Sequence, residues 1–436
     1  MKTVSRLALA AAFITGLGGM VTLPALAKDK KQEQKGDGLV LSDAVRKPAL
    51  AAQTALQAKD LATAETNIAA AEAAAKTDDE KYISASLRLA LEAGKISANP
   101  QHSAKDDAAL VPVLDALLAN PKTPQSEVGR DAYFRANIAF NAQQWQVASQ
   151  LYTRARDAGY VADDLPLQIV KSKVEGGDVH GGLADLDALI KAQQAKGQAV
   201  PEDWYRYAIP RVYRANDTMG TIEWTRRWLI AYPTSKNWRD AIYTFGFQGA
   251  GAQRLNKRQR IDLFRLMRAT KSLPDAAMYK EYAQSCIDLG LPNEAKSVIN
   301  EGKAAGVLTA TDSEATALLS QAQKSIAADK SFAAQEQAAN AGKDGVLAAQ
   351  TADAYLGAGD NAKAIQFYNL ALQKGGAVDA DEVNTHLGIA MVLSGDKAGA
   401  KAKFAAVKAA PRTDVANLWQ TFVDAPAPTA GTSTAS

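Results

Sequence analysis

An all-α fold is predicted for this chain of 436 residues, namely an α-solenoid in which helix–turn–helix hairpins stack into a right-handed superhelix. A small residue returns at the same place in a helix pair about every 34 residues, a period typical of stacked helical hairpins. Gly and Asp mark the turn inside each pair, and the alternating β-branched runs that indicate strands are missing. We therefore expect the apolar faces of each hairpin to be covered only by neighbouring hairpins, without a single enclosed core. We also expect a long curved surface that holds another molecule.

The recurrent small residue predicts where the two helices of a hairpin cross. Ala or Gly lets the helices approach closely, and the residues four and seven positions later lie on the same helix face. The clearest instances are Ala148 with Tyr152 and Ala155, Ala295 with Ile299 and Gly302, Ala364 with Tyr368 and Ala371, and Ala400 with Phe404 and Val407. Weaker instances begin at Ala64, Ala109 and Gly182.

A breaker lies five residues before the small residue and predicts the turn within each hairpin. Gly or Asn there fits a helix that ends in the left-handed conformation, which other side chains disfavour. The Asp that follows can accept hydrogen bonds from the free N–H groups of the second helix. The breakers and their following residues are Gly177-Asp178, Asn216-Asp217, Gly359-Asp360 and Gly395-Asp396, with Gly290 in a further unit.

The first residues are typical of a bacterial secretory signal. Lys2 and Arg6 precede a mostly apolar stretch at residues 7–21, and Ala25-Leu26-Ala27 is a small-residue cleavage site. We expect cleavage before Lys28 and a mature protein in the periplasm or outside the cell. A retained membrane anchor is the alternative, but the stretch is short and interrupted by glycines. No later run is apolar enough to span a membrane.

These features predict four segments. Residues 1–27 are the signal peptide, residues 28–40 a disordered charged leader, residues 41–424 the α-solenoid, and residues 425–436 a disordered Pro/Ala/Thr/Ser tail. The solenoid is expected to hold about ten hairpins, which begin near residues 45, 79, 129, 163, 202, 236, 276, 310, 345 and 381.

The chain resembles tetratricopeptide-repeat (TPR) proteins. That family carries small residues at positions 8, 20 and 27 of each repeat, aromatic residues near 11 and 24, and Pro near 32. The best-matching units have Ala352, Tyr355, Ala364, Tyr368 and Ala371, and then Leu387, Gly388, Met391, Ala400, Phe404 and Pro411. The resemblance implies an α-solenoid with an inner groove. A related α-solenoid, such as the helical superstructure that accompanies some envelope muramidases, is the neighbouring interpretation.

The sequence contains none of the common catalytic or metal-binding motifs. The three His residues, at positions 102, 180 and 386, have no metal-ligand spacing, and the single Cys286 excludes an intrachain disulfide and is expected in the core. Asp-Asp pairs at 78–79, 106–107 and 163–164 could do acid–base chemistry on a glycan, but helix starts explain them better. We expect a protein that is not an enzyme and binds no cofactor or metal.

One stretch departs from the nearly neutral character of the chain. Residues 200–275 hold 14 basic and seven acidic residues, and four of the six Trp residues. Trp and Arg are enriched at interface hot spots, and Arg binds carboxylates and phosphates with two hydrogen bonds. The stretch predicts a docking groove for an acidic partner, such as a peptide carboxylate, an anionic polysaccharide or a lipid headgroup. Alternatively, the Trp residues fill gaps between helices and the Arg residues line solvated faces.

The TPR resemblance also implies which positions face the inner groove. In the first helix of the central unit they are Arg206, Tyr213 and Arg214, although Pro210 disturbs that register. In an earlier unit they include Arg130, Tyr133, Asn137 and Asn141. Together with residues of the basic stretch, the candidate partner-binding set is Arg130, Tyr133, Asn137, Asn141, Arg206, Tyr213, Arg214, Trp224, Arg226, Arg227 and Arg258.

The sequence therefore predicts a non-catalytic periplasmic scaffold that binds envelope proteins or peptides through its concave groove. The alternative is a protein that binds glycan, either peptidoglycan or an acidic polysaccharide, or assists its export. A nucleic-acid partner is not expected, because the formal charge of the chain falls from +3 to about +1 once Lys2 and Arg6 are removed with the signal.

Overall fold

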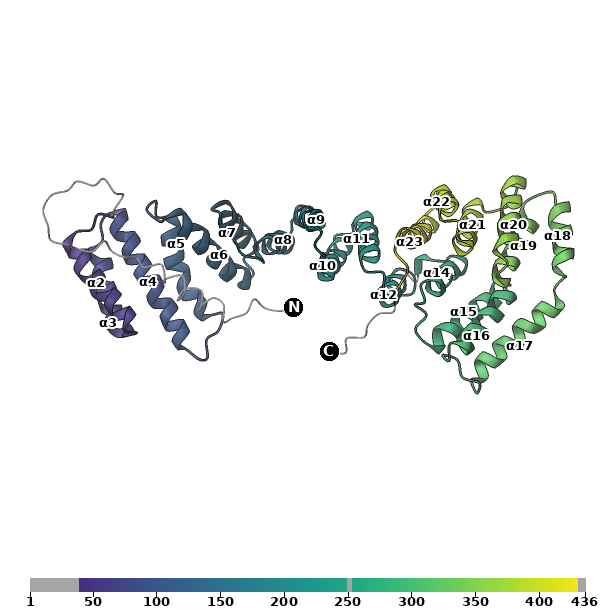
Figure 1. The fold of residues 1–436 in the computed structure, drawn as a ribbon, viewed down its shortest axis with the longest axis horizontal. Coiled ribbons are helices and arrows are strands. Elements are labelled where there is room, and N and C mark those ends of the chain that lie inside the picture. The colour runs from purple at the N-terminus through teal and green to yellow at the C-terminus, as the bar shows by residue number, and fades with distance from the viewer. Residues whose placement is uncertain (1–38, 249–252, 430–436) are drawn as a thin grey trace. The chain divides into compact units, whose positions relative to one another are not determined.

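The computed structural model describes residues 39–248 and 253–429, so the expected signal peptide and most of the charged leader lie outside the described residues. Within these ranges the chain is built from α-helices and one short 3-10 helix (Figure 1). The strand-like feature found there is an isolated bridge between Thr234 and Thr429. The predicted fold, an all-α solenoid of helix pairs, is confirmed.

The chain divides into two compact units between Val200 and Pro201. The first unit contains α2 (Asp43–Gln57), α3 (Leu61–Ala74), α4 (Asp78–Ala98), η1 (Asp106–Leu110), α5 (Val111–Ala119), α6 (Gln125–Asn141), α7 (Trp145–Asp157), α8 (Leu165–Glu175) and α9 (Val179–Ala195). The second unit contains α10 (Glu202–Arg214), α11 (Thr218–Ala231), α12 (Ser235–Gly246), α14 (Lys257–Ala269), α15 (Ala276–Asp288), α16 (Pro292–Ala304), α17 (Ser313–Ala328), α18 (Phe332–Ala341), α19 (Val346–Ala358), α20 (Asn361–Lys374), α21 (Ala380–Ser394), α22 (Lys397–Ala406) and α23 (Arg412–Asp424).

The turns inside the pairs have the predicted geometry. Gly359 ends α19 with φ +85° and Gly395 ends α21 with φ +91°, a conformation in which a Cβ atom would be strained. Asp360 and Asp396 then accept hydrogen bonds from the backbone N–H groups of the first turns of α20 and α22. Asn216 has φ +57° at the equivalent place before α11. These residues therefore have the turn and cap geometry that the local sequence predicts.

The small residues lie at the expected helix crossings. Ala148, Ala295, Ala364 and Ala400 are fully buried. A Cβ atom on Gly388 would lie 2.5 Å from Cε1 of the Phe404 ring, which shows how closely α21 and α22 approach. These crossings confirm the predicted role of the recurrent small residue in helix packing.

The second unit closes on itself through its last helix. α23 packs against its neighbours α21 and α22, and also against α11 and α14, which come much earlier in the chain. Its inner face carries Val415, Trp419 and Val423, all buried. The expectation that hairpins contact only their neighbours is therefore wrong for α23. A lone helix with one apolar face needs a partner on that face, and α11 and α14 provide it.

The chain continues to contact the unit after α23. The N–H of Thr429 donates to the carbonyl of Pro233 at 2.9 Å, and the N–H of Ser235 donates to the carbonyl of Thr429 at 3.0 Å. Residues 425–429, the first part of the segment predicted to be a disordered tail, therefore have a defined place beside the start of α12.

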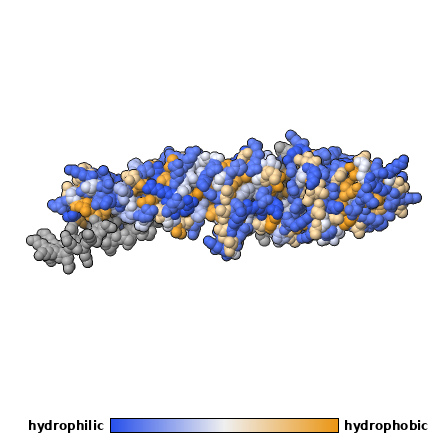
Figure 2. Space-filling model, turned by 90° about the horizontal axis from the view of Figure 1, so that it is seen from above, coloured by the Kyte–Doolittle hydropathy of each residue, from blue (hydrophilic) through white to orange (hydrophobic). Residues whose placement is uncertain are grey.

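The face of the molecule seen in Figure 2 is mostly hydrophilic, with apolar residues in small separate groups. Large hydrophobic side chains that are exposed include Tyr213 at 62% and Met219 at 76%, on either side of the turn between α10 and α11. No helix of the described residues is both long and apolar enough to cross a membrane.

Candidate functional site

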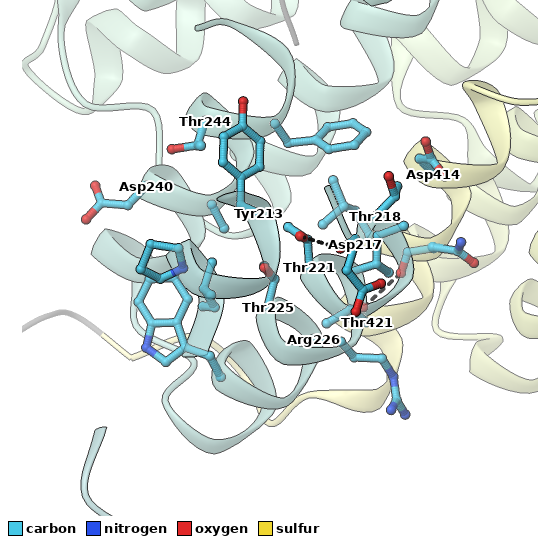
Figure 3. A pocket seen from close by; sticks show the side chains of 18 of the residues that line it. Tyr213, Asp217, Thr218, Thr221, Thr225, Arg226, Asp240, Thr244, Asp414 and Thr421 are labelled. Carbon is cyan, nitrogen blue, oxygen red and sulfur yellow. Dashed lines mark hydrogen bonds between the residues drawn. The ribbon is translucent and has the colours of Figure 1, made fainter. Parts of the chain in front are cut away.

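A cavity of about 870 Å³ lies in the second unit, between the first three helices of that unit and α23 (Figure 3). One wall comes from α10, α11 and α12, and the opposite wall from Asp414, Asn417, Leu418 and Thr421 of α23. The return of α23 to the start of the unit therefore creates the cavity. Its volume is in the range of sites that hold ligands.

One face of α10 forms a continuous stripe along this cavity. Arg206, Ile209, Pro210, Tyr213 and Arg214 all line it. Their spacing of three, four, seven and eight residues is that of a single helix face. The stripe has a basic side chain at each end and apolar or aromatic side chains between them.

Pro210 lies inside α10, which continues through it to Arg214. The predicted helical register is thus retained despite the proline. Because proline has no N–H, Pro210 cannot donate to the carbonyl of Arg206 four residues earlier. A carbonyl group beside the cavity therefore lacks its usual helical donor.

The interior of the cavity is less polar than its threonines suggest. The hydroxyl of Thr221 donates to the carbonyl of Asp217 at 2.8 Å, and that of Thr421 donates to the carbonyl of Asn417 at 2.8 Å (Figure 3). A hydroxyl that donates to its own helix has used its only donor. Apolar side chains, including Ile222, Phe245 and Leu418, complete the lining. The interior is suited to aliphatic groups.

Several charges that line the cavity are paired within the protein. Arg254 forms an ion pair with Asp414 at 3.1 Å, and Arg226 forms one with Asp424 at 3.3 Å. Asp240 pairs with Lys236 at 2.8 Å, and although burial alone would raise the pKa of Asp240, hydrogen bonds from Lys236 and Arg239 lower it. These ion pairs hold the charged side chains in place at the walls of the cavity.

Within the described residues, two basic side chains that line the cavity are not held in ion pairs of this kind. Over the described part of the chain, neither Arg206 nor Arg214 has an ion-pair partner. The guanidinium of Arg206 lies over the ring of Trp228, 5.9 Å from its centre. Trp228 is in turn fixed by a hydrogen bond from its indole Nε1 to Oε1 of Glu202 at 2.9 Å. A ring attracts a cation without neutralising it, so the N–H donors of Arg206 can still bind a carboxylate.

Stacking of Arg on aromatic rings recurs in the basic stretch. Arg227 lies over Trp224 at 4.4 Å, and Arg211 lies over Tyr207 at 3.9 Å. Trp224 is 7% exposed, and neither it nor Arg227 lines the cavity. Trp224 therefore fills a gap between helices, whereas other residues of the stretch face the cavity.

The cavity brings together four of the candidate partner-binding residues, which are Arg206, Tyr213, Arg214 and Arg226. Arg258 lies elsewhere in the unit and forms an ion pair with Glu382 at 3.0 Å. The residues of α23 that form the opposite wall were not anticipated, because no motif marks them and only the fold of the unit places them there.

The remaining candidates lie in the first unit, on α6. Tyr133 donates to Oδ1 of Asp164 at 2.7 Å, and Asn137 accepts from the hydroxyl of Tyr152 at 2.6 Å. Asn137 is 2% exposed, and Asn141 is exposed at the end of the helix. Arg130 pairs with the buried Asp131, whose pKa is raised to about 6 because burial outweighs that pairing. Tyr133 and Asn137 thus have structural partners.

A buried ionic cluster lies apart from the cavity, where α23 meets α14 and α21. Asp262, which is fully buried, accepts from Arg265 and Arg412 at 2.9 Å each. The imidazole of His386 lies between two carboxylates, with Nε2 3.1 Å from Asp262 and Nδ1 2.8 Å from Asp353. Burial alone would lower the pKa of His386, but these two carboxylates raise it to about 9. The cluster is ionised and internally paired, which indicates a structural role.

The chain was compared with protein families, curated proteins and solved structures. No family model matches the chain, and no curated protein matches it. Among solved structures, the crystal structure of the pentatricopeptide repeat protein PPR10 from maize matches 85% of this chain, with 12% sequence identity and a TM-score of 0.28. The chain spans 54% of the length of that protein chain. Similarity at this level gives no information about the function of the present chain.

Proposed function

We propose that this protein is a non-catalytic scaffold of the TPR type that binds a protein of the bacterial cell envelope in the cavity of its second unit. The observation that supports this most directly is the stripe on α10, where Arg206 and Arg214 flank apolar side chains at the edge of a ligand-sized cavity. Arg at the rim of an apolar site is typical of surfaces that recognise acidic partners. The repeated hairpins provide a rigid frame for this site.

A binding role fits the chemistry of the lining better than catalysis does. The carboxylate of Asp217 accepts from the N–H of Gly220 at 2.8 Å as the cap of α11. Asp240 and Asp414 are held in ion pairs with basic side chains. Carboxylates that are engaged in this way hold the helix start and the walls in place. A general acid or base would instead need to be within hydrogen-bond reach of a substrate.

The proposed location is the periplasm, and it depends on the signal sequence. Residues 1–27 carry the basic start, the apolar stretch and the Ala-Leu-Ala cleavage site. Intact mass measurement on protein recovered from the periplasmic fraction of a bacterial host is expected to show a chain that begins at Lys28. Recovery of the full-length chain from the cytosol would contradict this part of the proposal.

The binding proposal is tested by charge reversal. We expect the Arg206→Glu/Arg214→Glu variant to lose envelope proteins that the wild type recovers by affinity purification. The control is Lys296→Glu/Lys324→Glu, which changes the charge of the same unit equally at two exposed side chains outside the cavity. Equal recovery by both variants and the wild type would remove the cavity from the proposal.

The wild type and the Arg206→Glu/Arg214→Glu variant also test the alternative that the protein binds glycan. Tyr213, at 62% exposure, presents an aromatic ring at the cavity edge, and such rings stack on sugars as well as on peptides. Sedimentation with purified peptidoglycan, or with an acidic exopolysaccharide, is expected to leave the protein in the supernatant. Co-sedimentation that the Arg206→Glu/Arg214→Glu variant abolishes would indicate a glycan-binding protein instead.

A further inference from the structure

The geometry points to an extended peptide segment of a partner protein as the occupant of the cavity, with two carboxylates four residues apart and an aliphatic side chain midway between them. This inference rests on the proposed function and specifies its ligand. It depends on the stripe of α10, on the state of its two arginines and on the backbone around Pro210.

The spacing of the carboxylates follows from the helix. Arg206 and Arg214 are eight residues apart on one face of α10, which separates them by about 12 Å along the axis. In an extended chain, residues i, i+2 and i+4 point to the same side, and i and i+4 are about 13 Å apart. Two acidic residues at i and i+4 therefore match the two guanidinium groups, and residues i and i+2, about 7 Å apart, do not.

The two arginines are available for this contact. Arg226 and Arg254, which also line the cavity, already pair with carboxylates of α23. Arg206 is oriented by the Trp228 ring without being neutralised. Arg214 is exposed and has no ion pair within the described residues. A carboxylate that reaches Arg206 meets a cation that the Trp228 ring already orients, and one that reaches Arg214 meets a cation without a competing carboxylate among the described residues.

The middle of the stripe suits an aliphatic side chain and a peptide backbone. Ile209 and Pro210 lie between the two arginines, and Leu418 faces them from α23. The carbonyl of Arg206, which Pro210 leaves without its helical donor, can accept from a peptide N–H. The side-chain amide of Asn417 is exposed at the opposite wall and offers both a donor and an acceptor. An anionic lipid would use the arginines and the apolar floor but not these amide-matching groups.

The test uses blocked, fluorescein-labelled peptides with the full mature protein. The matching probe has the order Thr-Glu-Thr-Val-Thr-Glu-Thr, and two probes of nearly the same composition place the Glu residues two or six positions apart. A fourth probe replaces both Glu residues by Gln. We expect fluorescence anisotropy at about 50 mM salt to show that the matching probe binds about tenfold more tightly than each of the other three.

Two single variants connect this preference to the stripe. Arg206→Gln and Arg214→Gln are each expected to remove the preference for the matching probe over the other two Glu probes. Lys296→Gln, outside the cavity, is expected to keep it. Because Arg214 is exposed and makes no described ion pair, Arg214→Gln is expected to retain the circular dichroism spectrum and thermal transition of the wild type.

The outcomes separate the two levels of the proposal. Equal binding of all Glu probes, or unchanged binding by both Arg variants, overturns the inference about spacing. If no probe binds but the Arg206→Glu/Arg214→Glu variant still loses its envelope partner, the extended acidic segment is wrong and the proposed function stands. If a vesicle with anionic headgroups binds and displaces the matching probe, the occupant is a lipid and the inference is also overturned.

Discussion

The guanidinium of Arg412 donates to the carboxylate of Asp262 at 2.9 Å, although 150 residues separate them in the chain. From the same helix, the indole Nε1 of Trp419 donates to the backbone carbonyl of Asp262 at 3.0 Å. Asp262 is fully buried, and its pKa lies well below the usual value because the charges of His386, Arg265 and Arg412 outweigh the effect of burial. Two polar contacts of α23 therefore converge on one buried residue of α14, in addition to the apolar packing of α23 against α11, α21 and α22.

Loss of Arg412 is expected to destabilise the second unit strongly. Arg412→Leu removes one partner of a buried carboxylate and leaves that charge less compensated, which costs about 3–5 kcal/mol in the free energy of unfolding. Five of the six tryptophans lie in the second unit, so urea unfolding followed by tryptophan fluorescence reports mainly on it.

Arg258→Leu is the matched control for Arg412→Leu. Both arginines contact Glu382, but Arg258 is 56% exposed and Arg412 only 5%. The exposed pair is expected to contribute less than about 1 kcal/mol. If the two variants lose equal stability, burial of the Arg412–Asp262 pair is not what holds α23.

The charge of His386 is expected to make the stability of the second unit fall at alkaline pH. The pKa of His386 in the folded protein is about 9, above its usual value of 6.5, because Asp262 and Asp353 overcome the opposite effect of burial. A raised pKa means that the charged form is favoured by folding. This contribution is complete below about pH 6.5 and is lost as the pH rises through about 9. The urea midpoint is therefore expected to drop between about pH 7 and pH 10.

The His386→Gln variant isolates this effect from other titrating groups. It is expected to be less stable than the wild type at pH 7, and the difference should shrink as the pH approaches 10. His180→Gln, which makes the same change at an exposed position of the first unit, is the control for the substitution itself. Parallel pH profiles for the wild type and His386→Gln would show that the imidazole does not carry the charge assigned to it.

The close crossing of α21 and α22 predicts a large effect for one added methyl group. A Cβ atom at Gly388 would lie 2.5–2.8 Å from three atoms of the Phe404 ring, so Gly388→Ala is expected to cost about 1–3 kcal/mol through overpacking. Gly94→Ala is the comparison, because there the nearest atom is the flexible end of Leu61 at 3.3 Å. Chemical denaturation should show no loss for Gly94→Ala, since alanine favours the helix. Equal effects at the two sites would contradict the packing role of Gly388.

The helix pairs could be predicted from the sequence because their determinants are local. The left-handed Gly359, the cap Asp360 and the buried Ala364 lie within six residues of one another, and each acts on the backbone or on the adjacent helix. The contact between α23 and α14 has no such local marker. It joins residues far apart in the chain, and Arg412 and Asp262 belong to common residue types at unremarkable positions.

The candidate site was predictable to the extent that it follows helix periodicity. Arg206, Tyr213 and Arg214 share a face of α10, and the structure places that face along the cavity. Composition alone could not separate Trp224 from them, because an Arg–Trp pair stacked between helices and one at a binding surface use the same residues. The opposite wall of the cavity could not be predicted in this way, because it forms only where α23 packs against the earlier helices α11 and α14.

Filling the cavity is expected to block binding while the unit remains folded. Thr225 lines the cavity from α11, is only partly buried, and makes no hydrogen bond with its side chain among those described (Figure 3). Thr225→Trp places an indole where the peptide would lie, and the affinity for the matching acidic probe should fall at least about tenfold. Thr316→Trp, on the exposed face of α17, adds the same group outside the cavity and should bind the probe as the wild type does. Both variants should keep the wild-type circular dichroism spectrum, and unchanged affinity in Thr225→Trp would place the partner somewhere other than between α10, α11 and α23.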